Sequence, residues 1–207
     1  MWTTLGCLER IDENMEHHFF AMMSRMKYIE RWALMRNSEA ENISEHSLEV
    51  SMIAHMLTLI SNKRLGNQYN AERAAVLALY HDSTEIITGD MPTPIKYYNK
   101  EMKRTFHEIE EIAARQLIQM LPEDFRDDYE SIFFKQEEDV YLWRLVKAAD
   151  RLSALIKCIE EEKAGNTEFI KAKESIETSI KESGLKEVEI FMKEFLPSYY
   201  KTLDELS

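Results

Sequence analysis

The sequence is poor in cysteine, proline and glycine. Its 207 residues include two cysteines, four prolines and five glycines. Cys7 and Cys158 do not have the spacing of a disulfide framework or a zinc-binding motif, so we expect a reduced, cytoplasmic protein. Few residues that break helices, together with many Leu, Ile, Met, Glu, Lys and Ala, favour helical structure throughout.

Long apolar runs and an excess of basic residues are also missing. No stretch reaches about 18 consecutive apolar residues, and the first residues lack a basic region followed by an apolar one. We therefore expect neither a membrane span nor a signal peptide. The formal net charge of -12 argues against DNA or RNA polymers as partners, because no surplus of lysine and arginine exists to displace phosphate counterions. One small anion, held by a metal and a few local cations, remains compatible with this charge.

Apolar residues recur at helical spacing along most of the chain. Asn42 and Glu45 form the pattern of a capping box, and Gly66 is suited to end the helix that begins there. We expect a loop at residues 30–41 and helices at residues 12–29, 43–64, 70–87, 97–120, 123–133, 137–164, 167–183 and 185–200. No repeat, linker or alternating strand pattern is present, which predicts a single all-α domain.

His81 and Asp82 end an apolar run at residues 74–80. On the helix expected at residues 70–87 they would be neighbours about 100° apart, with Glu85 one turn later on the face of His81. An ionised aspartate at the end of a buried run is costly unless a cation or hydrogen bonds compensate it. By itself, the pair also fits a core histidine beside a capped or ion-paired aspartate.

Two further residues complete a candidate metal site. His46 begins an apolar face of its helix and should point inward, whereas His55 lies on the opposite side. Asp150 lies between apolar neighbours and also faces inward. With His81 and Asp82 these residues form a set of four nitrogen and oxygen ligands. Such a set suits a divalent transition metal with coordination positions open for water and substrate, rather than a closed structural zinc site.

Four ordered blocks carry a resemblance to a known family. The blocks are residues 31–37 (RWALMRN), 41–48 (ENISEHSL), 80–85 (YHDSTE) and 88–97 (TGDMPTPIKY), and the similarity continues at residues 147–150, 160–161 and 164–166. The order of His46, His81-Asp82 and Asp150 resembles the HD-domain metal-dependent phosphohydrolases, and the blocks are similar to the YfbR-type bacterial 5′-deoxynucleotidases. The likeness spans residues 16–204, with Ala33 where the family pattern has proline. We interpret residues 1–12 as an extension and residues 13–207 as one HD-domain helical bundle.

The resemblance implies a homodimer that hydrolyses deoxyribonucleoside 5′-monophosphates to deoxyribonucleoside and phosphate with metal-activated water. It implies that Glu85, Asp90 and Arg31 serve catalysis, that Arg31 orients the phosphate, and that Trp32 packs against the sugar. One divalent ion (cobalt, manganese or copper) would be bound by His46, His81, Asp82 and Asp150. The nucleotide would contact Arg31, Trp32, His46, Asp82, Asp90, Met91, Pro92, Thr93 and Asp150.

Other interpretations stay open at the level of sequence. Trp32 could anchor a loop, Arg31 could form a surface ion pair, and Asp90 and Thr93 could cap a turn. Sequence does not decide whether Glu85 or Asp90 activates the water or assists the departing 5′-oxygen. The alternative functions are another HD-family hydrolase acting on a nucleoside polyphosphate or an alarmone, a non-catalytic metal-dependent nucleotide-binding protein, and a metal-stabilised helical scaffold.

Overall fold

The computed structural model describes residues 16–96 and 98–207. Within these ranges the chain forms helices and no strand, and its one β-type pairing is an isolated bridge between Glu30 and Asn42. The predicted all-α class is therefore confirmed. In the described part of the chain, no helix combines the length and the apolar character that a membrane crossing requires.

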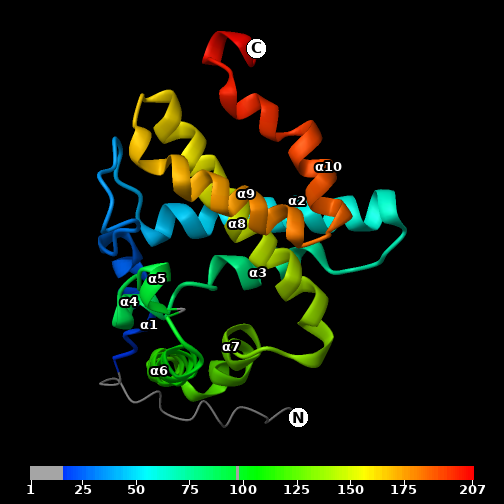
Figure 1. Cartoon of the computed structure of the whole chain (residues 1–207). Coiled ribbons are helices and arrows are strands. Elements are labelled where there is room, and N and C mark those ends of the chain that lie inside the picture. The colour runs from blue at the N-terminus through cyan, green and yellow to red at the C-terminus, as the bar shows by residue number, and fades with distance from the viewer. Residues whose placement is uncertain (1–15, 97) are drawn as a thin grey trace, which may run out of the picture.

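Two long helices form the centre of the molecule. α2 (Ile43–Leu65) packs against α8 (Val140–Lys163), and α3 (Ala71–Leu79) packs against both. Figure 1 shows α2 crossing the middle of the molecule, with α8 and α9 running over it. The principal core lies among these helices and includes the fully buried residues Val50, Leu57, Leu77, Leu145, Leu152 and Leu155. Burying such a side chain contributes about 1.5–3 kcal/mol each, so this core determines how the helices sit on one another.

The remaining helices cover the central group on two sides. α9 (Ile170–Glu182) packs on α8, and α10 (Lys186–Glu194) packs on α2. On the opposite side, α6 (Lys100–Gln119) and α7 (Arg126–Phe133) lie near α1 (Phe19–Met23), as Figure 1 shows. A small second core there contains Phe19, Leu117 and Leu121. Short 3-10 helices occupy Ser24–Tyr28, Glu123–Phe125, Glu137–Asp139, Thr167–Phe169, Leu196–Tyr200 and Leu203–Glu205.

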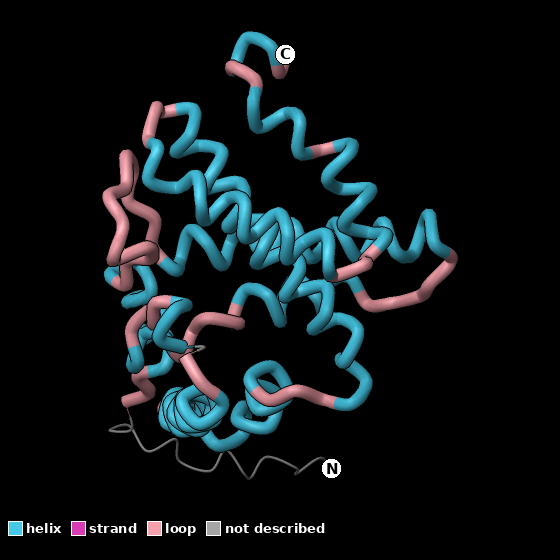
Figure 2. Tube along the Cα trace, in the orientation of Figure 1, coloured by secondary structure: helices cyan, strands magenta, loops and turns pink. Residues whose placement is uncertain are grey.

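The boundaries of α2 match the sequence prediction. The Asn42 side chain accepts hydrogen bonds from the backbone amides of Ser44 and Glu45 at 3.0 and 3.1 Å, and the Glu45 side chain completes the capping box. The helix ends at Leu65, and Gly66 follows with φ +78°, a conformation that glycine adopts without steric cost. The loop predicted at residues 30–41 is also confirmed, and Figure 2 shows it as a long pink stretch before α2.

The helix predicted at residues 70–87 is wrong in its second half. α3 ends at Leu79, a turn follows, and α4 (Glu85–Thr88) begins a new helix. The cause is local: His81 Nδ1 lies 2.6 Å from the carbonyl oxygen of Ala78, and the Ser83 hydroxyl donates to the carbonyl of Tyr80 at 2.7 Å. Side chains thus occupy carbonyls that a continuing helix would use.

The first predicted helix and the predicted break at residues 89–94 also differ from the structure. Residues 1–15 lie outside the described residues. They include the proposed extension at residues 1–12 and the start of the helix predicted at residues 12–29. In the described part that helix begins only at Phe19 and continues as a 3-10 helix to Tyr28. A short helix, α5 (Thr93–Lys96), forms where only a break was expected. Pro94 is compatible with it, because a proline in the first turn of a helix removes no intrahelical hydrogen bond.

The cap at Asn42 gives a test of how strongly the start of α2 is held. Replacing Asn42 by alanine leaves the amides of Ser44 and Glu45 without this acceptor, and we expect the free energy of unfolding to fall by about 1 kcal/mol in urea denaturation. Asn42→Asp keeps an acceptor oxygen at the same place and should stay close to the wild type. Equal stability of Asn42→Ala and the wild type would contradict the cap.

Candidate active site

Three parts of the chain bring the predicted metal ligands together. His46 comes from the first turns of α2, His81 and Asp82 from the turn after α3, and Asp150 from the middle of α8. One ligand atom each of His46, His81 and Asp150 lies within 4.8 Å of the other two. The Asp82 carboxylate adjoins them, with Oδ2 at 3.6 Å from His46 Nε2 and 3.3 Å from His81 Nε2. His55, which the helical spacing placed elsewhere, is not part of this cluster.

Both imidazoles turn the same nitrogen toward the cluster. His81 Nδ1 lies 2.6 Å from the carbonyl oxygen of Ala78, which can only accept, so Nδ1 carries the proton. His46 Nδ1 lies 3.0 Å from the hydroxyl of Ser153, and the ring is 1% exposed. With its proton on Nδ1, His81 presents the lone pair of Nε2 to the cluster, and His46 does the same when the Ser153 hydroxyl accepts from its Nδ1. A hydrogen bond on the other nitrogen is the usual way in which a protein orients a metal-binding histidine.

The arrangement fits a divalent cation. Nε2 of both histidines is buried and has no hydrogen-bond partner in the described part of the chain. His46 Nε2 nevertheless lies 3.1 Å from Asp150 Oδ1. A lone pair facing a carboxylate oxygen at this distance is repulsive unless a proton or a cation lies between them. Two imidazoles and two carboxylates are also a donor set that several transition metals accept.

Charge around Asp150 supports its ionised form. Burial acts to raise the pKa of this carboxyl, but His46 and His81 in their protonated forms, together with Arg31, lower it below its ordinary value. The side chain of Asp150 keeps 40% of its surface exposed. The Nε2 atoms of the two histidines are thus buried, and the cluster opens toward solvent at Asp150, where a substrate could enter.

Glu85 differs from the other acids in holding its proton. It starts α4, is 5% exposed, and its Oε2 has no hydrogen-bond partner among the described residues. Burial, followed by repulsion from Asp82 and Asp90, raises the pKa of Glu85 to about 9. The sequence analysis placed Glu85 one helical turn above His81; the structure places it after a turn, yet still within the electrostatic reach of Asp82. The raised pKa favours the neutral carboxyl, the form that can donate a proton.

Asp90 and Lys96 lie on the segment that follows α4. Burial raises the pKa of Asp90 above its ordinary value, while Arg31 and a hydrogen bond from the backbone amide of Trp32 oppose this rise. Lys96 Nζ binds Glu110 on α6 at 2.8 Å and lies 4.6 Å from the centre of the Phe106 ring. The segment is therefore attached to the loop before α2 on one side and to α6 on the other.

Arg31 and Trp32 share one carboxylate. Glu41 Oε2 accepts from Arg31 Nε at 3.0 Å and from Trp32 Nε1 at 2.8 Å, and Arg31 Nη1 reaches Asp82 Oδ2 at 3.3 Å. Burial acts to lower the pKa of Arg31, but Asp82, Glu41 and other nearby carboxylates raise it. Trp32 has φ +59°, the only positive φ of a non-glycine residue in the described ranges. This conformation costs about 1–2 kcal/mol, and such strain is concentrated at functional sites.

The loop that carries Arg31 and Trp32 is anchored to α8 by a buried carboxylate. Glu161, 1% exposed, accepts from the backbone amide of Ser38 at 2.8 Å, from Lys157 Nζ at 2.5 Å and from Asn166 Nδ2 at 2.7 Å. Although burial acts to raise it, these donors lower the pKa of Glu161 to about 2. The charged form is therefore kept. If residues 36–39 left α8, Glu161 would lose the Ser38 amide and Lys157 Nζ would lose the carbonyl oxygen of Glu39, which it binds at 2.6 Å.

The structure thus gathers most of the predicted site residues around one place. Met91 and Pro92 are half-buried between Asp90 and α5, and Thr93 begins α5. Sequence reasoning missed Glu41 and Glu161 as supports of the loop. The available signal was weak: both acids stood inside the blocks similar to the family, but nothing in their spacing indicated that they would face the loop.

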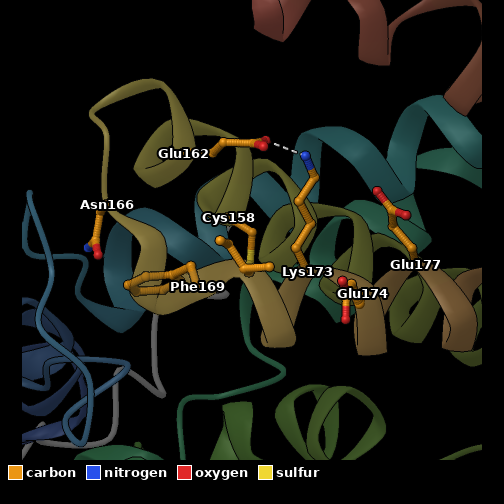
Figure 3. Close-up of a pocket in the computed structure, with 8 residues that line it drawn as sticks. Cys158, Glu162, Asn166, Phe169, Lys173, Glu174 and Glu177 are labelled. Atoms are coloured by element: carbon orange, nitrogen blue, oxygen red, sulfur yellow. Dashed lines mark hydrogen bonds and ion pairs between the residues drawn. The ribbon is translucent and has the colours of Figure 1, made fainter.

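A pocket separate from this cluster lies between α8 and α9. It encloses about 230 Å³ and is lined by Cys158, Glu162, Asn166, Phe169, Ile170, Lys173, Glu174 and Glu177. Figure 3 shows Glu162 and Lys173 paired across it. The pocket includes none of the predicted site residues, although the ring centre of Phe169 in its lining is 5.3 Å from that of Trp32. It is not the predicted active site.

The proton on Glu85 predicts how the stability of the metal-free protein depends on pH. The folded-state pKa of about 9 lies above the ordinary value of 4.5. Between these two pH values the folded chain keeps a proton on Glu85 that the unfolded chain loses. The stability that this proton contributes declines as pH rises from about 5 to about 9. Glu85→Gln removes it. We expect the Tm of Glu85→Gln, relative to the wild type, to increase across this interval in the presence of a chelator. A constant difference would contradict the raised pKa.

Comparisons with known proteins agree with the geometry. A family model described as 5′-deoxynucleotidase YfbR-like matches residues 18–199. A 5′-deoxynucleotidase of Vibrio vulnificus is 47% identical over 192 residues, covering 93% of this chain and 99% of the relative. Among solved structures, an HD-domain phosphohydrolase of Listeria innocua superposes with a TM-score of 0.74 at 26% identity and covers 88% of each chain.

A more distant structure shares the fold. The cyanophage S-2L HD phosphohydrolase, solved with dA and one catalytic Zn²⁺ ion, has a TM-score of 0.57 at 22% identity and covers 88% of this chain and 96% of its own. The HD-domain fold predicted from the sequence is thus confirmed. By the match over residues 18–199 and the identity to its relatives, the chain belongs to the YfbR-like family of 5′-deoxynucleotidases.

Proposed function

We propose that this protein is a metal-dependent 5′-deoxynucleotidase, a hydrolase that cleaves deoxyribonucleoside 5′-monophosphates to deoxyribonucleoside and phosphate. Membership of the family supports the reaction. The observation that carries the proposal is the cluster of two unpartnered, buried Nε2 atoms beside the carboxylates of Asp82 and Asp150. A phosphomonoester needs charge neutralisation at this point, and the protein alone supplies more carboxylates than cations there.

His46, His81, Asp82 and Asp150 would hold one divalent ion. Cobalt, manganese and copper are the ions that the family resemblance suggests, and the donor set does not distinguish among them. When bound, such an ion polarises a phosphoryl oxygen and supplies a water of lowered pKa. Arg31 would bind the phosphate through its permanently charged, planar fork, which Glu41 already holds in place at 3.0 Å.

Glu85 and Asp90 would divide the proton transfers. Because Glu85 favours its neutral form, it is suited to donate a proton to the departing 5′-oxygen. Burial also raises the pKa of Asp90, but Arg31 and the backbone amide of Trp32 oppose this rise, so of the two acids Asp90 is the one suited to orient or deprotonate the water. This division chooses between two assignments that the sequence left open.

Trp32 would select the sugar. The Glu41 bond to its Nε1 at 2.8 Å and the Phe169 ring fix the indole on one side. An indole packed against C2′ leaves a ribose hydroxyl without a partner, and burying that hydroxyl costs about 1–3 kcal/mol. Assembly into a homodimer, which the family resemblance also suggests, remains a prediction.

The proposal predicts phosphate release from deoxynucleotides after chelation and metal reconstitution. Purified protein would be assayed with each dNMP and NMP and a panel of divalent ions. We expect release of phosphate from dNMPs with at least one ion, and Glu85→Gln should lower kcat by about 10²–10⁴-fold while nucleotide binding persists.

Other results would identify the alternative functions. Pyrophosphate release from nucleoside polyphosphates would indicate a different HD hydrolase. Tight dNMP binding without turnover would indicate a non-catalytic binding protein. Loss of thermal stability on chelation, without nucleotide binding or turnover, would indicate a scaffold.

Sugar selection gives an independent prediction. Trp32→Ala should raise the AMP to dAMP ratio of kcat/KM by about ten-fold, because the space it opens lets water solvate the 2′-hydroxyl. Phe169→Leu, which changes the aromatic contact behind the indole but leaves Trp32 in place, is the matched control and should shift the ratio less. An unchanged ratio in Trp32→Ala would mean that another residue selects the sugar.

A further inference from the structure

A row of polar side chains alternates between the two central helices. From the candidate metal site inward, it runs through Asp150 on α8, His46 on α2, Ser153 on α8 and Glu49 on α2. Asp150 Oδ1 lies 3.1 Å from His46 Nε2, His46 Nδ1 lies 3.0 Å from Ser153 Oγ, and Ser153 Oγ lies 2.5 Å from Glu49 Oε2. His46 and Ser153 are buried, so no water shell replaces these contacts.

The row has a defined direction when Glu49 is ionised. A carboxylate can only accept, so the single proton of the Ser153 hydroxyl points at Glu49. The oxygen of Ser153 is then left as an acceptor for His46 Nδ1, which must carry the proton. This tautomer leaves the lone pair of His46 on Nε2, the atom that faces Asp150 and His81.

We propose that Ser153 and Glu49 are positioning residues that hold His46 in the tautomer able to bind the metal. The inference rests on the proposed function, because it concerns the same metal site. Ser153 and Glu49 are not among the proposed metal ligands or substrate contacts. They would act through His46. A change in such a supporting hydrogen bond commonly lowers metal affinity by about 10–100-fold.

The chain offers a matched control for Ser153. Ser47 is also fully buried, and its Oγ has no hydrogen-bond partner among the described residues. Ser47→Ala therefore removes the same atom without breaking the row. Glu49 lines an apolar groove with Met52 and Met56, so Glu49→Met removes the acceptor oxygens with a side chain of similar length in compatible surroundings.

The first measurement reads the tautomer in the metal-free protein. Imidazole ¹⁵N chemical shifts would be recorded at about pH 8.5, above the pKa of about 7 to which burial raises Glu49. In the wild type and Ser47→Ala we expect His46 protonated on Nδ1. In Ser153→Ala, and in Glu49→Met, we expect part of the population to lose the Nδ1 proton and to carry a proton on Nε2 only, where Asp150 Oδ1 at 3.1 Å can accept it. The same Nδ1 tautomer in all four proteins would overturn the proposal.

The second measurement uses Co²⁺ alone, with its visible absorption followed in competition with a chelator. Ser153→Ala and Glu49→Met should bind Co²⁺ about 10–100-fold more weakly than the wild type, while Ser47→Ala stays within about two-fold. The double variant should lose little more than Ser153→Ala, since both changes break one row. Additive losses, or a loss in Ser47→Ala equal to that in Ser153→Ala, would indicate a general packing effect and overturn the positioning role.

The two measurements separate this inference from the proposed function. Should the wild type bind no Co²⁺ or other divalent ion at these residues, the metal site itself would fail, whereas the ¹⁵N experiment would still decide whether Ser153 and Glu49 fix the tautomer. Thermal unfolding of each metal-free variant checks that the fold persists, and Glu49→Met provides the test should Ser153→Ala prove unstable.

Discussion

The contact between α2 and α8 is the constraint on which the candidate site depends. His46 belongs to one helix and Asp150 to the other, and their facing atoms lie 3.1 Å apart. The same two helices bury Leu57 and Leu152 in the principal core. Because protein interiors are closely packed, these apolar contacts resist small changes in helix spacing. The core therefore sets the distance between the ligands, and a metal ion would meet a geometry that folding has already produced.

Charge imposes the second constraint. The chain has a formal net charge of -12, and the site gathers further carboxylates, yet its family acts on anionic nucleotides. Three features reconcile these facts. Glu85 keeps its proton through burial, Arg31 is held by Glu41 and Asp82, and the two orphaned Nε2 atoms favour a divalent cation. Neutralisation is thus local and confined to the proposed phosphate position, which is consistent with a small substrate rather than a polyanionic polymer.

Much of the fold could be predicted because its causes are local. Helical spacing indicated α2 and α8, and the capping box at Asn42 and the glycine at position 66 marked the ends of α2. The break after α3 could not be read in the same way. It depends on the side chains of His81 and Ser83, which bind the carbonyl oxygens of Ala78 and Tyr80. These hydrogen bonds compete with those of a continuing helix, and helix propensities do not predict which set forms. The grouping of the site residues came from inward-facing positions together with family similarity, while Glu41 and Glu161 needed the folded loop.

The row through Ser153 and Glu49 shows where sequence reasoning stops and why. His46 and Glu49 are three residues apart on one helix, and Asp150 and Ser153 are three apart on the other, so each pair shares a face. That much follows from spacing alone. Which face meets which, and at what register, follows from the side chains that fill the interface. Only then does the proton of Ser153 point to Glu49 rather than to His46. The protonation of a metal-facing histidine is in this sense a consequence of helix packing, because a shift of one turn between α2 and α8 would separate these partners and leave the tautomer undetermined.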